Sequence, residues 1–151
     1  MILGPGAIAP DFTLANQFGQ PVSLTDFRGV KPVTLVFFPL AFSRTCQGEL
    51  CELRDHLAMF EASGTELLGV SVDSKHALRA WAEEQGYDFP LLADFWPHGG
   101  VARAYGAFLE ERGYADRATF VIGVDGVIRS SFATAPGEAR TLEQYRAALA
   151  G

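Results

Sequence analysis

Two apolar runs with a helical pattern between them constrain this fold more than any other feature of the sequence. The runs cover residues 33–38 and 67–72, and such continuous runs are typical of strands buried on both faces of a parallel sheet. Between them, apolar residues recur at spacings of four, three, four and three, which predicts one helix that ends at Ser63-Gly64. The residues of this stripe are Cys46, Leu50, Leu53, Leu57 and Phe60. The segment therefore predicts a strand–helix–strand unit with a right-handed crossover.

The rest of the chain adds strands and helices around this unit. Short strands at 11–14 and 22–24 flank a polar turn and predict an N-terminal β-hairpin extension. Downstream we expect a helix from Asp73-Ser74 to Gly86, a strand at 89–93, a short helix at 100–105, strands at 118–124 and 127–132 around Asp125-Gly126, and a final helix capped by Thr141 and Gln144. This order predicts an α/β protein with a thioredoxin-like fold, in which helices flank a central mixed β-sheet. Residues 1–151 are expected to form one domain.

Charge and hydropathy argue against several classes of protein. The chain of 151 residues has 12 Lys and Arg against 18 Asp and Glu, so its formal net charge is −6. This balance lacks the basic footprint expected for binding nucleic acid or anionic lipid. The longest apolar stretch, at 35–42, covers about eight residues, whereas a membrane-spanning helix needs ~20. No basic residue precedes Arg28, so the start lacks the charged region of a signal peptide and we expect a cytoplasmic protein.

The two cysteines, Cys46 and Cys51, lie five residues apart. In a reducing cytoplasm such a pair is more typical of a reactive site than of a structural disulfide. A zinc site would need about four ligands at recognisable spacings. The three histidines, His56, His76 and His98, are roughly twenty residues apart and form no such set. Metal binding is therefore the weaker interpretation, and no cofactor is expected.

Cys46 falls in the first turn of the predicted helix, just beyond the carboxyl end of a central strand, where open α/β sheets bind ligands. The unpaired N–H groups of a helix start favour a thiolate over a thiol. Burial opposes that charge, so the site needs positive partners, and the candidates are Arg44 and Arg117. Ser43 offers a hydroxyl that can orient a substrate oxygen, and Pro39 is placed to shield the site from water.

The pattern Pro39-x-x-x-Ser43-x-x-Cys46 resembles the active-site motif of the peroxiredoxins. The resemblance extends over nearly the whole chain and includes the stretches 9–14, 89–99 and 117–122. Within that family, residues 37–42 and 46–50 look most like the one-cysteine AhpE type.

This resemblance implies a thiol peroxidase that needs no metal, haem or flavin. In such an enzyme, the Cys46 thiolate would attack hydrogen peroxide or an organic hydroperoxide and become a sulfenic acid. Pro39, Ser43 and Arg117 would complete the peroxide site. Glu49 matches a family glutamate, and it either serves the chemistry, caps a helix end or holds an arginine.

Cys51 departs from the AhpE pattern. The spacing Cys46-x-x-x-x-Cys51 instead resembles the resolving pair of many peroxiredoxin Q, or bacterioferritin comigratory, proteins. That resemblance implies that Cys51 condenses with the sulfenic acid of Cys46 to form an intramolecular disulfide. On an intact helix the two Cα atoms are about 8–9 Å apart, beyond disulfide range, and Cys51 points away from the apolar stripe, so the first turns would have to unwind. Gly48 weakens the helix between them, whereas the alternative is a bystander cysteine on a solvated face.

The reductant, the assembly and two other functions stay open from sequence. The reductant is a thioredoxin, a mycoredoxin or a low-molecular-weight thiol, and the family resemblance implies a homodimer, although peroxiredoxin Q members are often monomers. A thioredoxin-like disulfide reductase is opposed by the missing Cys-x-x-Cys, since position 49 is glutamate. The non-enzymatic alternative is a thioredoxin-fold binding or holdase module with a vestigial cysteine.

Overall fold

The computed structural model describes residues 1–150, and its centre is a mixed seven-stranded sheet. The strand order is β2-β1-β5-β4-β3-β8-β9. The strands are β1 (Thr13–Ala15), β2 (Pro21–Ser23), β3 (Val33–Phe37), β4 (Glu66–Ser71), β5 (Leu91–Ala93), β8 (Arg117–Ile122) and β9 (Ile128–Thr134). β3 and β5 run parallel to β4, while β8 is antiparallel to β3 and β1 is antiparallel to β5. The predicted mixed sheet is confirmed, and the N-terminal hairpin forms one edge of it.

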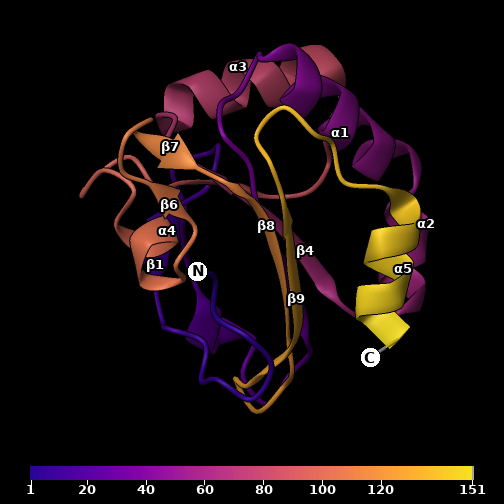
Figure 1. The fold of residues 1–151 in the computed structure, drawn as a ribbon. Helices are drawn as coiled ribbons and strands as arrows, with labels where there is room; N and C mark the ends of the chain where they lie inside the picture. Colours follow the sequence, from indigo (N-terminus) through magenta and orange to yellow (C-terminus); the bar gives the residue numbers. More distant parts are fainter. Residues whose placement is uncertain (151) are drawn as a thin grey trace.

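Helices cover both faces of this sheet (Figure 1). They are α1 (Arg44–Asp55), α2 (Leu57–Ala62), α3 (Lys75–Gln85), α4 (Gly100–Ala104) and α5 (Leu142–Ala150), with a 3-10 turn η1 (Leu24–Asp26) and a small hairpin of β6 (Phe108–Leu109) and β7 (Tyr114–Ala115). Helices α1, α2, α3 and α5 share one apolar cluster with the sheet, whereas α4 and the N-terminal segment contribute to the cluster on the opposite face. The predicted alternation of strands and helices is thus confirmed. The sequence did not predict the β6–β7 hairpin, because strands of two residues are too short to show an alternating pattern.

One predicted helix is wrong in its length, because the segment expected to run to Ser63-Gly64 is broken at His56. The backbone of His56 leaves the helical region, with φ −119° and ψ 24°. Its N–H donates to the carbonyl oxygens of Glu52 and Leu53 in the last turn of α1. Its ring Nδ1 also lies 3.0 Å from the carbonyl oxygen of Glu52. α2 begins at Leu57, and its Phe60 is still buried in the core and packs against Tyr145 of α5.

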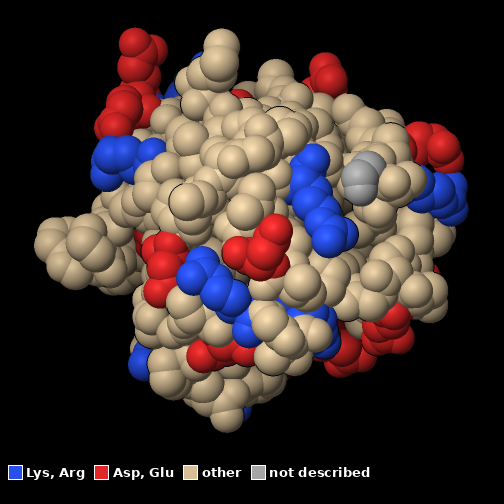
Figure 2. All heavy atoms as spheres, turned by 90° about the horizontal axis from the view of Figure 1, so that it is seen from below, with Lys and Arg blue, Asp and Glu red and all other residues tan. Residues whose placement is uncertain are grey.

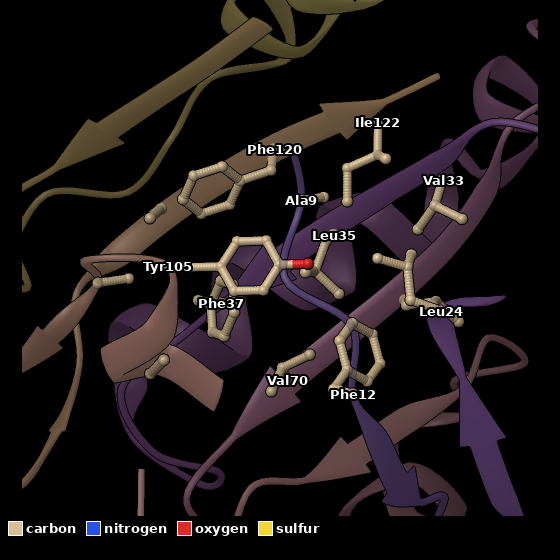
Figure 3. Packing of buried hydrophobic residues seen from close by; sticks show 14 of the residues in the cluster. Ala9, Phe12, Leu24, Val33, Leu35, Phe37, Val70, Tyr105, Phe120 and Ile122 are labelled. Atoms are coloured by element: carbon tan, nitrogen blue, oxygen red, sulfur yellow. The ribbon is translucent and has the colours of Figure 1, made fainter. Parts of the chain in front are cut away.

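The cluster on the α4 side fixes the two strands that carry the candidate site (Figure 3). Tyr105 lies at its centre, with ring centroids 5.5 Å from Phe37 of β3 and 5.0 Å from Phe120 of β8. Its hydroxyl donates a hydrogen bond of 2.6 Å to the carbonyl of Pro10, which satisfies the one polar atom of a buried ring. β3 and β8 are therefore held together from a single packed layer.

Figure 2 shows the face opposite to α3, and positive and negative side chains lie interspersed on it. Several positive groups lie directly beside negative ones, and the view contains no broad field of one sign. Within residues 1–150, no helix has both the length and the apolar character needed to cross a membrane.

Candidate active site

The loop from β3 to α1 places Cys46 in the first turn of α1, fully buried. Asp73, just after β4, anchors this loop by accepting hydrogen bonds from the N–H of Ala41 (2.8 Å) and the hydroxyl of Ser71 (2.6 Å). The helical ladder starts with the N–H of Gln47 bonded to the carbonyl of Ser43 at 2.8 Å. The N–H groups before Gln47 therefore have no carbonyl acceptor inside the helix, and their partial positive charge lies beside Cys46.

Arg117, the first residue of β8, makes direct contact with this sulfur. Its Nη2 donates to Cys46 Sγ at 3.1 Å, its Nη1 to Glu49 Oε1 at 2.9 Å and its Nε to the carbonyl of Pro136 at 2.7 Å. The guanidinium is buried, and three bonds in different directions fix its plane. Since a guanidinium has five N–H donors, two remain for another acceptor at the sulfur.

Glu49 lies between two buried arginines. Arg140 donates to it from Nη2 (2.6 Å), from Nε (2.9 Å) and from its backbone N–H (2.8 Å), while Arg117 binds the same carboxylate. Burial acts to raise the pKa of Glu49, but the hydrogen bonds and charge of Arg140, with the charge of Arg117, outweigh it and hold the pKa below its ordinary value of 4.5. Glu49 therefore holds arginines, which was one of the roles that the sequence left open.

The charges of this cluster favour a thiolate at Cys46. Two buried guanidinium groups face one buried carboxylate, so one positive charge is left without a partner within the cluster. An uncompensated buried charge is strongly unfavourable. A thiolate on Cys46, in contact with Arg117, neutralises it.

Sequence reasoning missed Arg140, although the predicted topology contained a signal for it. β9 is antiparallel to β8, and the Cα partner of Arg117 is Thr134, at the end of β9. The chain after Thr134 must therefore pass close to Arg117, and Figure 1 shows the β9–α5 connection arching back toward α1. Arg140 lies in that connection and also donates to the carbonyl of Ala118 and the hydroxyl of Thr119, both at 3.0 Å.

The other residues of the motif lie around the same turn. Pro39 is buried, and Ser43 occupies the N-cap position of α1. The Ser43 hydroxyl makes no capping hydrogen bond to the helix and donates instead to the carbonyl of Leu40 at 2.9 Å. Its lone pairs thus remain free to accept a hydrogen bond from a substrate. Arg44 is exposed, and among the described residues the side-chain donor to Cys46 is Arg117 and not Arg44.

Cys51 lies off the apolar stripe of α1, as its position in the helix predicts, but it does not face open solvent. It is half-buried against the end of α3 and the residues that follow. Its Sγ lies 3.5 Å from Gln85 Oε1 and 3.3 Å from the hydroxyl of Tyr87. Both cysteines are free thiols, and α1 is continuous through both of them.

His56 and His98 take part in local contacts rather than in this site. His98 Nε2 lies 2.7 Å from the carbonyl of Gly113, and His56 binds within its own turn. Across residues 1–150, no three His, Cys, Asp or Glu side chains are grouped so that they could hold a metal ion.

Comparison with known proteins shows the family of the chain that carries this buried cysteine and its arginine. Residues 5–131 match the model of the AhpC/TSA family. The chain belongs to the peroxiredoxins. A relative named alkyl hydroperoxide reductase E, from Mycobacterium tuberculosis, is 50% identical over 149 residues, which cover 99% of this chain and 97% of that protein. This peroxiredoxin is thus an enzyme of the thiol-dependent peroxidase class, as its motif predicts.

Solved structures give the same result for the fold. The crystal structure of Enterococcus faecalis AhpC superposes with a TM-score of 0.88 at 32% identity, covering 99% of this chain and 92% of that one. The structure of peroxidoxin BcpB from M. tuberculosis gives a TM-score of 0.83 at 28% identity, covering 98% and 95%. The predicted thioredoxin-like fold of this peroxiredoxin is therefore confirmed.

We predict that Glu49→Gln lowers the free energy of unfolding by about 3–5 kcal/mol at pH 7, because it leaves two buried guanidinium groups without a carboxylate. The folded-state pKa of Glu49 lies below 4.5, so its contribution is present above that pH and is lost as the pH falls through the folded value. The gap between wild type and variant should therefore narrow as the pH falls below 4.5.

Denaturant unfolding at several pH values measures both effects. Glu83→Gln is the matched control, since Glu83 pairs with Arg79 on the surface of α3 and its loss should change stability by less than ~1 kcal/mol. A Glu49→Gln protein as stable as the wild type at pH 7 would contradict the balanced cluster.

Proposed function

We propose that this peroxiredoxin reduces hydrogen peroxide and organic hydroperoxides at Cys46. The observation that carries the proposal is the bond between the buried Arg117 guanidinium and Cys46 Sγ, with Glu49 and Arg140 behind it. In this proposal Cys46, Arg117, Ser43 and Pro39 have catalytic roles, whereas Glu49 and Arg140 position Arg117; the contacts among Cys46, Arg117, Glu49 and Arg140 support it.

The first step is a displacement at oxygen. The Cys46 thiolate attacks the terminal oxygen of the hydroperoxide, an S–O bond forms, and the O–O bond breaks. Both electrons of that bond go to the departing oxygen, which takes a proton from water and leaves as an alcohol, or as water when the substrate is hydrogen peroxide. Cysteine is oxidised to a sulfenic acid and the peroxide is reduced.

Donors that are already in place stabilise the charge of this transition state. In the proposed mechanism, the remaining N–H donors of Arg117 and the N–H groups at the start of α1 stabilise the negative charge that develops on the departing oxygen beside Cys46. The Ser43 hydroxyl oxygen can accept a hydrogen bond from the O–H of the hydroperoxide, because Ser43 donates its own proton to the carbonyl of Leu40. Buried Pro39 keeps water from the sulfur. A thiolate of lower basicity is also a weaker nucleophile, so ionisation of Cys46 alone does not explain a fast reaction. The hydrogen-bond donors around the departing oxygen therefore supply the acceleration.

We predict that Arg117→Lys reduces the rate constant for reaction with hydrogen peroxide on the order of 10²-fold, because lysine keeps the charge but loses the planar fork. Stopped-flow mixing, followed by loss of free thiol, measures this step. Cys46→Ser should not react, and Arg79→Lys, on the exposed side of α3, should match the wild type. A wild type no faster than free cysteine would refute the proposed function, and an unimpaired Arg117→Lys would refute the role of the fork.

The second step of the proposed cycle uses Cys51. Its sulfur attacks the sulfur of the Cys46 sulfenic acid, the S–S bond forms, the S–O bond breaks, and the hydroxyl leaves as water with the proton of Cys51. A thioredoxin, a mycoredoxin or a low-molecular-weight thiol then reduces the disulfide. A reducing compartment such as the cytoplasm would supply these reductants.

This step requires α1 to open. The helix is continuous from Arg44 to Asp55, so its geometry holds the two Cα atoms about 8–9 Å apart, whereas a disulfide tolerates ~4.4–6.8 Å. Gly48 lies between the cysteines on an exposed part of the helix, where glycine costs ~1 kcal/mol relative to alanine. Opening of the first turns would also bring the disulfide to the surface, where a reductant reaches it.

A homodimer is part of the proposal. The side chains of Phe95 and Trp96 are 55% and 81% exposed, and they follow β5 on neighbouring positions of one loop. Large exposed aromatic side chains of this kind are typical of surfaces that bind another protein.

We predict that Cys51→Ser leaves the oxidation of Cys46 fast but lowers turnover with thioredoxin and increases over-oxidation to sulfinic acid, because the sulfenic acid then persists. Intact mass and peptide mapping after one equivalent of peroxide separate the products: an internal disulfide in the wild type and a sulfenic acid in the variant. Unchanged turnover with thioredoxin would make Cys51 a bystander and the protein a one-cysteine peroxidase.

A further inference from the structure

The outer face of α1 is tied to the end of α3 by a set of side-chain contacts that the peroxide step does not use. Trp81 Nε1 donates to Gln47 Oε1 at 3.3 Å, and Arg54 Nη1 donates to the carbonyl of Gln85 at 2.5 Å. Between these two contacts, Cys51 Sγ lies against Gln85 and Tyr87. The contacts therefore span residues 47–54 of α1, which include the part that must open before Cys51 can reach Cys46.

Tyr87 is the central member of this set. Its hydroxyl lies 3.3 Å from Cys51 Sγ and 3.4 Å from the backbone carbonyl of Gln47, which it contacts as a donor. Its ring is held independently, 5.1 Å from Trp81 and 5.6 Å from Phe89 between centroids. One hydroxyl thus bonds two positions of α1 from a fixed ring.

The environment keeps this hydroxyl a donor. Tyr87 is buried, and burial together with the neighbouring Cys51 raises its pKa well above the ordinary value. Arg54 is the cation nearest in this set and acts in the opposite direction. Because Tyr87 donates its one proton to the Gln47 carbonyl, it accepts from Cys51, whose single thiol proton can go either to the Tyr87 oxygen or to Gln85 Oε1.

We propose that Tyr87 is a positioning residue for the resolving step: its hydroxyl holds residues 47–51 in the helical state and so limits the rate at which Cys51 reaches oxidised Cys46. This inference rests on the proposed resolving role of Cys51. Both hydrogen bonds of Tyr87 exist only while α1 is closed, because opening carries Gln47 and Cys51 away from a ring that stays in the core. The contact therefore stabilises the state that exposes the sulfenic acid to a second peroxide, and it opposes the state that forms the disulfide.

The test compares two rates in the full-length protein. After mixing with one equivalent of hydrogen peroxide, samples are quenched with acid at different times, alkylated and analysed by mass spectrometry. The masses give the rates of Cys46 oxidation and of disulfide formation separately. Tyr87→Phe keeps the ring and removes the hydroxyl, so we expect disulfide formation about fivefold faster and Cys46 oxidation unchanged. Over-oxidation at excess peroxide should fall in parallel. A merely structural role would not separate the two rates in this way.

Gly48→Ala tests the same opening of α1 by stabilising the closed helix instead of weakening it. A Cβ at position 48 meets no atom within 4 Å, so alanine fits the closed helix and stabilises it. We expect disulfide formation to be about fivefold slower and over-oxidation to increase. Tyr114→Phe is the matched control, because Tyr114 lies in β7, its hydroxyl contacts Arg112, and both rates should equal those of the wild type.

The outcomes separate the two proposals. If the wild type forms the disulfide but Tyr87→Phe forms it at the same rate or more slowly, the Tyr87 inference is overturned and the resolving role of Cys51 stands. An unchanged rate in Gly48→Ala also overturns the inference, since helix opening would not limit the step. If the wild type forms no internal disulfide, the resolving role fails, and the Tyr87 inference fails with it.

Discussion

The structure depends on the contact between a buried arginine and a buried sulfur, because neither charge is favourable there alone. Arg117 reaches Cys46 at 3.1 Å only because Glu49 and the carbonyl of Pro136 fix its plane. Glu49 in turn is shared with Arg140, so the cluster reaches neutrality when Cys46 is ionised. Reactivity and stability are therefore coupled: the same charges that prepare the thiolate hold α1, β8 and the β9–α5 connection together.

The fold brings these groups together from three distant parts of the chain. Cys46 and Glu49 lie on α1, Arg117 begins β8 next to β3, and Arg140 lies in the connection that returns from β9. The layer around Tyr105 fixes β3 against β8 from the far face of the sheet. The sheet thus positions Arg117, whereas the helix that carries both cysteines is bonded to Gln85 of α3 and to Tyr87.

Local patterns in the sequence predicted those parts of the site that local chemistry determines. The apolar runs and the stripe from Cys46 to Leu53 predicted the turn on which Cys46 lies, and the motif predicted its family. The break at His56 was missed because apolar spacing continues across it, while the backbone of His56 leaves the helical region. Arg140 and the Tyr87 contact depend on residues that are far apart in sequence, and no spacing rule in one segment contains them. Likewise, Cys51 could be placed off the apolar stripe, but only the position of α3 shows what it faces.

The ionisation of Cys46 in the resting protein tests this coupling most directly. In a Cys51→Ser protein, the ultraviolet absorbance of the thiolate can be measured at pH 7, with the double variant that also carries Cys46→Ser as the baseline. We predict an absorbance above this baseline that corresponds to one thiolate per chain, and a smaller absorbance when Arg117→Gln is added, because Arg117 contacts the sulfur. An absorbance at pH 7 equal to the baseline would contradict the neutral cluster and the role of Arg117 with it.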